Sequence, residues 1–422
     1  MTLQVLLLAT IPQGAAGTIR DHVHALKAYS RHRVRCFPHV GVIGNHLPAA
    51  IALHEFDVLV IHYSVYLLSE DYLGRAARAE IAAFPGTKLL FVQDEYRQVD
   101  RMVSTIRELR IDVLFTCVPD QEIESVYPEK LLPGVVKISN LTGYVPQALT
   151  HYPSPKTTTR PIDVGYRARI LPFWLGKLSA EKWRIGPEFL AATREYGLRC
   201  DVSVREEDRI YGDRWIRFLA SCRTTLGVES GASVIDFEGT IQKRVEAFMD
   251  ANPHASFEEV EQRFLLEHEG KIRLNQISPR CFEAAALRTG MILFEGEYSG
   301  VLTAWQHYIP LRKDFSNIDE VVETLRDDRR IQAIADRAYE EVALNPKYSY
   351  RTFVARFDAA ISAVGEHSRR TYTKRVNAVR FGLAVLPSSI FPYLLKCWLM
   401  IPTSVRAKLK PVLSPLIAVI RR

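Results

Sequence analysis

The sequence predicts an α/β protein made of two Rossmann-like domains that face each other across a cleft. Near-continuous apolar runs, each followed by a helix-forming segment, recur along the first 150 residues, as expected of parallel strands buried on both faces. The same alternation begins again after a Pro- and Thr-rich connector at residues 151–161. A chain of 422 residues is also too long for one ordinary core, so two domains are expected.

The first domain is predicted at residues 1–150. It opens with a strand, a Gly-bearing turn and a helix, the usual start of a doubly wound sheet. The helices are expected at residues 18–30 and 69–84, and the strands at residues 4–10, 56–64, 87–95, 111–118 and 135–143.

The second domain is predicted at residues 162–347. Its strands are expected at residues 162–166, 198–204, 224–230 and 291–294, with helices at 179–196 and 317–325 and a charged helical insertion at 238–270. In the helix at 317–325, the apolar residues follow a spacing of i, i+3, i+4 and i+7, and Ser316 or Asn317 is the expected cap. A last helix at residues 348–365 is predicted to close the globular part.

A short helix beginning Ser278-Pro279-Arg280 contains one acid, Glu283, among apolar residues. Ser278 suits the N-cap and Pro279 the first helical position, where no backbone donor is needed. The positive end of this helix and Arg280 would favour an anion in the preceding turn. Glu283 lies too deep for capping and needs a partner, which is either Arg280, three residues earlier on the helix, or a ligand.

The sequence Arg280-Cys-Phe-Glu-Ala-Ala, followed by Gly290 and a strand, resembles the GT-B glycosyltransferases of the "glycosyl transferases group 1" kind. The Arg-x-Phe-Glu element is similar to the spore-maturation-protein-like branch. The resemblance is strongest between residues 161 and 325, and residues 307–325 also match that branch. It implies a GT-B fold and a nucleotide-sugar donor bound by the second domain.

The resemblance also implies roles for individual residues. Glu283 would take the ribose hydroxyls, and the helix start at Ser278 and Arg280 would face the diphosphate. Arg167 or Arg169, with Lys177 or Lys182, would neutralise the leaving phosphate, since no metal is expected. Independently of the resemblance, the position of Glu229, Ser230 and Gly231 directly after a strand predicts that they contact phosphate or sugar. The second acid of the larger relatives is replaced here by Asn275.

In the first domain, Gly14 and Gly17 shape the loop after the first strand, where such enzymes admit the acceptor. Polar residues also end two predicted strands: His62 with Tyr63, and Asp94 with Glu95. Asp94, Glu95 and His62 are the candidates for holding the acceptor hydroxyl or acting as a base. A strand-end Asp that caps the next helix is the structural alternative.

Charge is distributed unevenly along the chain. Residues 366–422 contain 11 Lys or Arg and one acid, whereas the other 365 residues contain 44 basic and 47 acidic side chains. Because the body is slightly acidic, a nucleic-acid partner is not expected. The tail combines short, Pro-broken apolar pieces with flanking cations, which favours in-plane binding to an anionic membrane surface. A tail that binds a protein partner is the alternative.

The sequence therefore predicts a metal-independent enzyme without a cofactor, which transfers sugar from a nucleotide sugar to a glycan or lipid-linked acceptor. By resemblance, the reaction would retain anomeric configuration. Six widely spaced cysteines without a CxxC pair indicate a cytoplasmic location, and the tail indicates peripheral attachment at the inner face of a membrane. The alternatives are a nucleotide-sugar epimerase and a catalytically silent membrane-recruited scaffold of the same fold.

Overall fold

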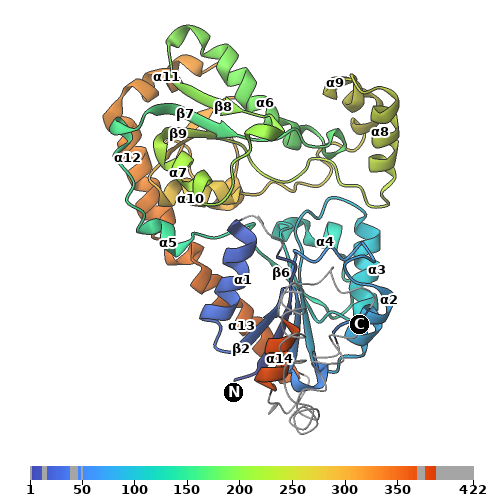
Figure 1. Cartoon of the computed structure of the whole chain (residues 1–422). Helices are drawn as coiled ribbons and strands as arrows, with labels where there is room; N and C mark the ends of the chain where they lie inside the picture. The colour runs from blue at the N-terminus through green and yellow to red at the C-terminus, as the bar shows by residue number, and fades with distance from the viewer. Residues whose placement is uncertain (1, 12–16, 39–45, 49–50, 368–375, 386–422) are drawn as a thin grey trace, which may run out of the picture.

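The computed structural model describes residues 2–11, 17–38, 46–48, 51–367 and 376–385. They form two lobes, each built on a fully parallel sheet (Figure 1). The strands that lie centrally in the two sheets are apolar and buried on both faces, because helices cover each sheet from both sides. The predicted α/β class and the two tandem units are confirmed.

The first sheet has the order β2-β1-β3-β4-β5-β6. Its strands are β1 Gln4–Leu8, β2 Arg33–Phe37, β3 Val58–Ile61, β4 Thr87–Phe91, β5 Val113–Thr116 and β6 Val136–Ser139. Its helices are α1 Gly17–Tyr29, α2 Arg75–Ala83, α3 Val99–Leu109, α4 Ile123–Val126 and α5 Gln147–Thr150. The order reverses between β2 and β3, so the loops that leave the carboxyl ends of β1 and β3 diverge there, as at other ligand-binding switch points.

The second sheet has the order β11-β10-β9-β7-β8. Its strands are β7 Ile162–Arg167, β8 Cys200–Ser203, β9 Cys222–Gly227, β10 Gly290–Phe294 and β11 Ile309–Leu311. Its helices are α6 Lys177–Ala192, α7 Asp213–Ser221, α10 Pro279–Ala286, α11 Ile318–Arg326 and α12 Asp328–Ala338. The carboxyl ends of the strands in this sheet face the first lobe, which brings the loops of both sheets to one interlobe space.

The predicted closing helix, α13 (Tyr350–His367), does not stay with the second lobe. It crosses back and packs against α1 and β4 of the first lobe, where Phe353 and Phe357 join the core of that lobe (Figure 1). The connector is likewise anchored: the buried guanidinium of Arg160 donates to four groups, the carbonyls of Pro155, Cys222 and Leu287 and the hydroxyl of Thr289. Two chain crossings therefore join the lobes.

The predicted charged insertion forms α8 Thr240–Ala251, α9 Phe257–Val260 and a π-helical turn, Glu261–Leu265. These elements pack on the short turn Phe173–Leu175 through an apolar cluster that includes Trp174, Val245, Val260 and Leu265. The segment before α8 also reaches the first lobe, since the backbone N–H of Asp236 donates to the carbonyl of Tyr96 at 2.8 Å. The insertion therefore stands at the edge of the interlobe space (Figure 1).

Two strands were not predicted from the sequence. β2 is an edge strand in which Arg33 and Arg35 alternate with Val34 and Cys36, so it lacks the continuous apolar run that marked its neighbours. β11 has only three residues. At α10, Ser278 and Pro279 occupy the predicted N-cap and first helical positions, but the Ser278 side chain makes no capping hydrogen bond.

Most of the predicted cationic tail lies outside the described residues. The described part, residues 376–385, contains α14 (Ala378–Ala384), which docks on the first lobe. Phe381 packs edge-on against Phe56, and Arg380 forms an ion pair with Glu55. Within the described ranges, we find no helix with both the length and the apolar character needed to cross a bilayer.

Two histidines meet in the core of the first lobe. The Nε2 of His62 lies 3.0 Å from Nδ1 of His22 in α1, and the backbone N–H of Ser64 donates to Nδ1 of His62 at 3.1 Å. Since Nδ1 of His62 is an acceptor, its Nε2 carries the proton and donates to His22. Burial lowers the pKa of His22 to about 3 and also lowers the pKa of His62.

This pair predicts acid-sensitive stability. Below about pH 6.5 the unfolded chain takes up protons that the folded pair excludes, so the free energy of unfolding should fall as the pH drops from 7 to 5. His22→Gln removes one such site and should flatten this fall, whereas His24→Gln, at an exposed position of the same helix, should not. Urea unfolding at several pH values measures the free energy of unfolding. If this free energy falls equally with pH in both variants, the buried pair is not the cause of the acid sensitivity.

Candidate active site

A cavity of about 430 Å³ lies between the lobes. The first lobe contributes the start of α1 and the loop after β4, and the second lobe contributes the loop after β7, α6, α7 and α10. Of the residues predicted from the sequence, those that line this cavity are Gly17, Asp94, Glu95, Arg167, Arg169, Lys182, Ser230, Gly231, Ser278, Arg280 and Glu283. Residues that are far apart in the chain are thus brought to one space.

Glu283 is held by an indole and not by a guanidinium. The Nε1–H of Trp215, in α7, donates to Oε2 of Glu283 at 2.8 Å. Burial raises the pKa of this carboxyl, against the lowering effects of Trp215 and Arg280. Oε1 receives no hydrogen bond from any residue that the structure describes, and the side chain lines the cavity. Glu283 therefore presents one acceptor oxygen to a ligand.

Arg280 turns away from Glu283. Its guanidinium donates to the carbonyl of Arg167 and lies 4.8 Å from the ring centroid of Trp215. In the described structure the two side chains form no ion pair, although Arg280 is close enough to lower the pKa of Glu283. The structural alternative raised from the sequence, an Arg280–Glu283 pair on the helix surface, is therefore wrong.

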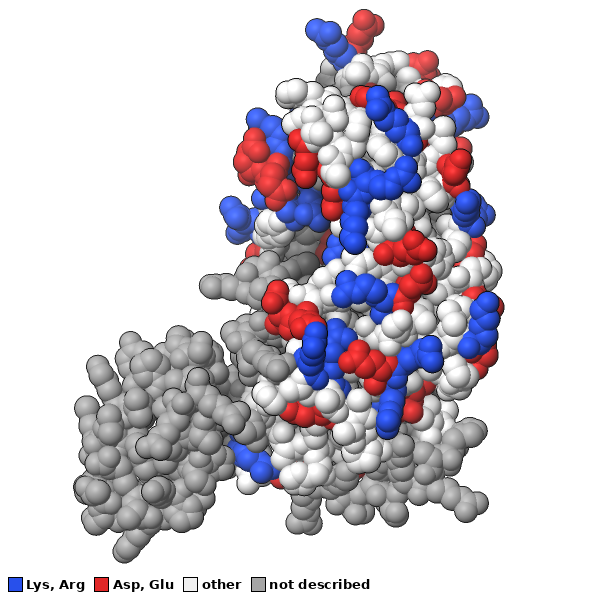
Figure 2. Space-filling model, turned by 90° about the vertical axis from the view of Figure 1, so that its right-hand side faces the viewer, with Lys and Arg blue, Asp and Glu red and all other residues white. Residues whose placement is uncertain are grey.

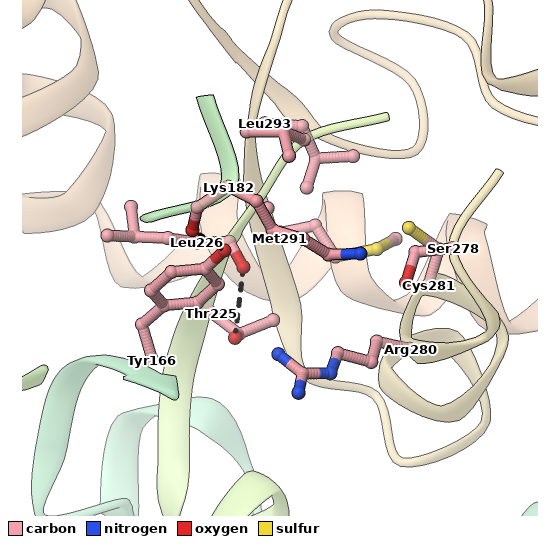
Figure 3. Close-up of a pocket in the computed structure, with 11 residues that line it drawn as sticks. Tyr166, Lys182, Thr225, Leu226, Ser278, Arg280, Cys281, Met291 and Leu293 are labelled. Atoms are coloured by element: carbon pink, nitrogen blue, oxygen red, sulfur yellow. Dashed lines mark hydrogen bonds between the residues drawn. The ribbon is translucent and has the colours of Figure 1, made fainter. Parts of the chain in front are cut away.

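Cations gather at the amino end of α10. Lys182, from α6, and Arg280 approach the same narrow crevice in the cavity wall, with Ser278 beside them (Figure 3). Burial lowers the pKa of Lys182 to about 8, with a further lowering effect from Arg280. Arg169 is exposed on the loop after β7, and its guanidinium has no hydrogen-bond or ion-pair partner among the described residues. Three positive groups and a helix start can thus meet one anion.

Gly231 is required by the backbone around it. Its φ of +112° disfavours other residues, and a Cβ at this position would lie 1.9 Å from the carbonyl oxygen of Leu274. The close approach lets Ser230 pair with Gln276 through two backbone hydrogen bonds, of 2.7 and 2.9 Å. This pairing fixes the segment that leads into α10, so the cations and Glu283 keep their relative positions.

No family model matches the chain, and no curated protein sequence is similar to it. Among solved structures, it is similar to an α-glucosyltransferase in complex with UDP-glucose and DNA containing an abasic site. The identity is 10%, the TM-score is 0.50, and the match covers 85% of this chain and 100% of the other.

The chain has the GT-B fold. Two further solved structures match with lower TM-scores. Anabaena HepE in complex with UDP has 9% identity, covers 86% of this chain and 100% of its own, and has a TM-score of 0.48. T4 phage BGT in complex with UDP and Mn²⁺ has 10% identity, covers 86% and 99%, and has a TM-score of 0.45. The spore-maturation-like branch expected from the sequence is not among these matches.

Within this GT-B fold, two residues predicted to bind the donor serve structural contacts instead. Lys177 lies outside the cavity and pairs with Glu261 of the insertion at 2.7 Å. The carboxylate of Glu229 accepts from the side chain of Asn275 at 2.7 Å and from the backbone N–H of Tyr298 at 2.8 Å, and it does not line the cavity. Lys182, the alternative to Lys177, is the lysine in the wall.

Arg167 lines the cavity, but its guanidinium is occupied. It pairs with Asp201 at 2.7 Å and donates to the carbonyls of Tyr166, Asp201 and Asp208. Between the two arginines left open by the sequence, Arg169 is therefore the one with an unpaired guanidinium.

The three predicted catalytic candidates separate in the structure. His62 is fully buried beneath α1 and does not reach the cavity, so that assignment is not supported by its position. Glu95 lines the cavity, but its oxygens accept from the hydroxyls of Thr116 and Tyr127 and from the backbone N–H of Cys117. Burial raises the pKa of Glu95 to about 7. Asp94 is exposed in the cavity.

Asp94 has left-handed backbone, with φ of 57°, directly after β4. Such a conformation costs free energy in a non-glycine residue and is common at functional sites. Asp94 faces the second lobe closely enough to raise the pKa of Lys182, against the larger lowering effect of burial. Gly17 also lines the cavity, and a Cβ there would meet nothing within 4 Å, whereas Gly14 lies outside the described residues.

Sequence reasoning missed Trp215, which orients Glu283, and Tyr211, which is 45% exposed at the cavity. Neither carries a motif, since both precede β9 in an ordinary-looking helix and loop. Asp21 was also missed: it lies on α1 near Glu283, and its charge helps to raise the pKa of Glu283.

The cations predict pH-dependent anion binding. Since Lys182 loses its charge as the pH rises through about 8, the affinity for pyrophosphate should fall between pH 7 and pH 9. Lys182→Gln should weaken binding at pH 7 by about tenfold and remove most of the pH dependence. Lys177→Gln lies outside the cavity and should change neither the affinity at pH 7 nor its pH dependence. Isothermal titration calorimetry measures the affinity for pyrophosphate. If Lys177→Gln loses binding and Lys182→Gln does not, Lys182 is not the lysine that binds the anion.

Proposed function

We propose that this protein is a glycosyltransferase, which transfers a sugar from a nucleotide-sugar donor to an acceptor hydroxyl. The main observation behind the proposal is that Trp215 donates to Oε2 of Glu283 and leaves Oε1 open to the cavity. The other end of the same cavity is lined by cations. A carboxylate oxygen can accept from a ribose hydroxyl, and cations beside a helix start suit a diphosphate. The two features are what a nucleoside diphosphate requires of one site.

The base would lie beyond the ribose. Tyr211 is exposed in the cavity wall next to Ile210, so an aromatic face is available there for a flat base. The fold is shared with a structure whose ligand is UDP-glucose, which supports uridine as the first nucleotide to test.

In the reaction, the bond between the anomeric carbon and the diphosphate oxygen breaks, and a bond to the acceptor oxygen forms. The negative charge that develops on the leaving diphosphate is stabilised by Arg169, Lys182 and Arg280. The acceptor gives up its proton, either to Asp94 or, if configuration is retained, to the leaving diphosphate. We infer retention from the family resemblance, and the anomeric coupling constant of the product tests it.

We infer metal independence from the same three cations, which supply positive charge where other transferases use a divalent ion. Transfer should therefore continue at an unchanged rate after dialysis against EDTA. Turnover that disappears with EDTA and returns with Mg²⁺ or Mn²⁺ would refute this part of the proposal.

The acceptor is inferred to be a glycan or lipid-linked sugar, reached at the inner face of a membrane by the cationic tail. Nucleic acid is not favoured, although the similar structure contains DNA. On the face of the described residues seen in Figure 2, Lys and Arg are interspersed with Asp and Glu and form no single-sign band. Phosphate backbones require such a band.

Glu283→Gln tests the donor site directly. It keeps the shape of the side chain but replaces an anionic acceptor by a neutral amide, so the affinity for the correct nucleotide sugar should fall about tenfold or more. Glu267→Gln, at an exposed position of the insertion, should leave this affinity unchanged. A thermal-shift screen with UDP, GDP, ADP and CMP sugars selects the donor, because a ligand that binds only the native state raises the Tm.

The same screen, followed by analysis of the products formed from each donor that binds, separates the alternatives. A chain that neither binds nor hydrolyses any nucleotide sugar is not a glycosyltransferase. Binding without turnover would support the silent scaffold, and conversion of the donor sugar without an acceptor would support the epimerase.

A further inference from the structure

Two stems join the helical insertion to the second lobe, an outgoing stem at residues 235–239 and a return stem at residues 272–277. Both stems lie against the first lobe, although they belong to the chain of the second. Each stem places two apolar side chains on the core of the first lobe: Ile235 and Phe237 from the outgoing stem, and Ile272 and Leu274 from the return stem. Separation of the lobes at this edge would therefore expose apolar surface to water.

The outgoing stem is hydrogen-bonded to the loop after β4 and to α3. The backbone N–H of Asp236 donates to the carbonyl of Tyr96 at 2.8 Å, and the backbone N–H of Asp100 donates to the carbonyl of Phe237 at 3.1 Å. Asp100 lies in the first turn of α3, where backbone N–H groups have no partner within the helix. Gln98, the N-cap of α3, makes no capping bond with its side chain. A residue of the second lobe thus caps a helix of the first.

The side chain of Asp236 sets the turn that leads from the outgoing stem into α8. It is 1% exposed, and its two oxygens accept from the backbone N–H groups of Gly239 and Gln242, both at 2.8 Å. Gly239 has a φ of +83°, and a Cβ there would lie 2.9 Å from Cγ of Gln98. Only glycine permits this close approach without strain. One buried carboxylate therefore holds the stem against the first lobe.

The return stem contacts the loops after β5 and β6. The side-chain amide of Gln276 donates to the carbonyl of Cys117, and the hydroxyl of Thr142 donates to the carbonyl of Ile277. The chain then enters α10, the helix that carries Glu283. The return stem therefore links the first lobe directly to the helix of the candidate donor site.

The lobes are thus held together at two separate edges. Figure 1 shows the crossing from α12 to α13 on the left and the insertion on the right. A hinge motion about α13 would have to break the backbone bonds of the outgoing stem and uncover its apolar residues. The cavity nevertheless reaches solvent, since Tyr211 in its wall is 45% exposed. A ligand can therefore enter without separation of the lobes.

We propose that the two stems form a clasp that holds the lobes together before any ligand binds, and that Asp236 is the positioning residue of this clasp. The loop after β4 is then held from the opposite lobe, so Asp94 keeps its place across the cavity from the cations of α10. Such a site is preorganised and binds without a closing motion. The part given to Asp94 rests on the proposed function, whereas the clasp itself does not.

The first experiment loosens the clasp. Asp236→Ala removes both acceptors of the turn, so the radius of gyration in small-angle X-ray scattering should rise. The affinity for UDP should fall about three- to tenfold, because only a fraction of the molecules then holds the lobes together. UDP in excess should return the radius of gyration to that of the wild type. Asp250→Ala, at an exposed position of α8, should leave both quantities unchanged.

The second experiment locks the clasp. Because a Cβ at Gly239 would lie 2.9 Å from Cγ of Gln98, the pair Gln98→Cys with Gly239→Cys is close enough for a disulfide between the lobes. The oxidised chain should show the same UDP-induced rise in Tm and the same turnover as the chain reduced with dithiothreitol. Adding this disulfide to Asp236→Ala should restore the affinity for UDP, which would not happen if the substitution merely damaged the fold.

Three results would overturn the proposal. The first is an oxidised chain that loses its UDP response and regains it with dithiothreitol, since the lobes would then have to separate at this edge. The second is a wild-type radius of gyration that shrinks when UDP is added. The third is Asp236→Ala with the scattering and UDP affinity of the wild type. If Asp236→Ala does not fold, the disulfide in the otherwise unchanged chain decides. A wild type that responds to no nucleotide refutes the proposed function, and the scattering of Asp236→Ala against Asp250→Ala still tests the clasp.

Discussion

The hydrogen bond from Trp215 to Glu283 is the interaction on which the arrangement of the interlobe cavity depends. It joins α7 to α10 and satisfies one oxygen of a buried carboxylate without neutralising its charge. An ion pair with Arg280 would have closed the site, because a guanidinium can occupy both oxygens. Instead, Arg280 stacks on Trp215 and remains beside the helix start, so a negative and a positive subsite persist a short distance apart.

The two-sheet architecture explains why these subsites meet the first lobe. Parallel strands place their following loops at one edge, and the two sheets present those edges to each other. The chain crosses between the lobes twice, through the anchored connector and through α13, and the segment before α8 adds a contact between Tyr96 and Asp236. Asp94 thus keeps a defined position relative to the cations of the second lobe.

Much of this could be predicted from local sequence, since the information lies within a few residues. Short sequence patterns predicted the apolar strands, the Ser278-Pro279 start of α10 and the presence of Glu283 and Gly231 at the site. β2 was not predicted because an edge strand with alternating arginines lacks the apolar run of a central strand. The tail remains a prediction, since residues 386–422 lie outside the described structure.

The site assignments that the geometry does not favour share a physical cause: each depended on a partner distant in the chain. Lys177 could not be told from Lys182 until Glu261 was seen to hold it. His62 ends a strand as an active-site residue would, but His22 covers it. Glu95 stands beside Asp94 in sequence, yet Thr116 and Tyr127 occupy its oxygens. No sequence pattern marks Trp215, because its role is to donate a hydrogen bond to Glu283, which lies far away in the chain.

The central claim is that a nucleoside diphosphate spans the space from Glu283 to the cations at the start of α10. A crystal structure of the chain with UDP bound tests it most directly. We expect a ribose hydroxyl within hydrogen-bonding distance of Oε1 of Glu283, with phosphate oxygens on Lys182, Arg169 or Arg280. A nucleotide bound elsewhere, or a ribose turned away from Glu283, would contradict it.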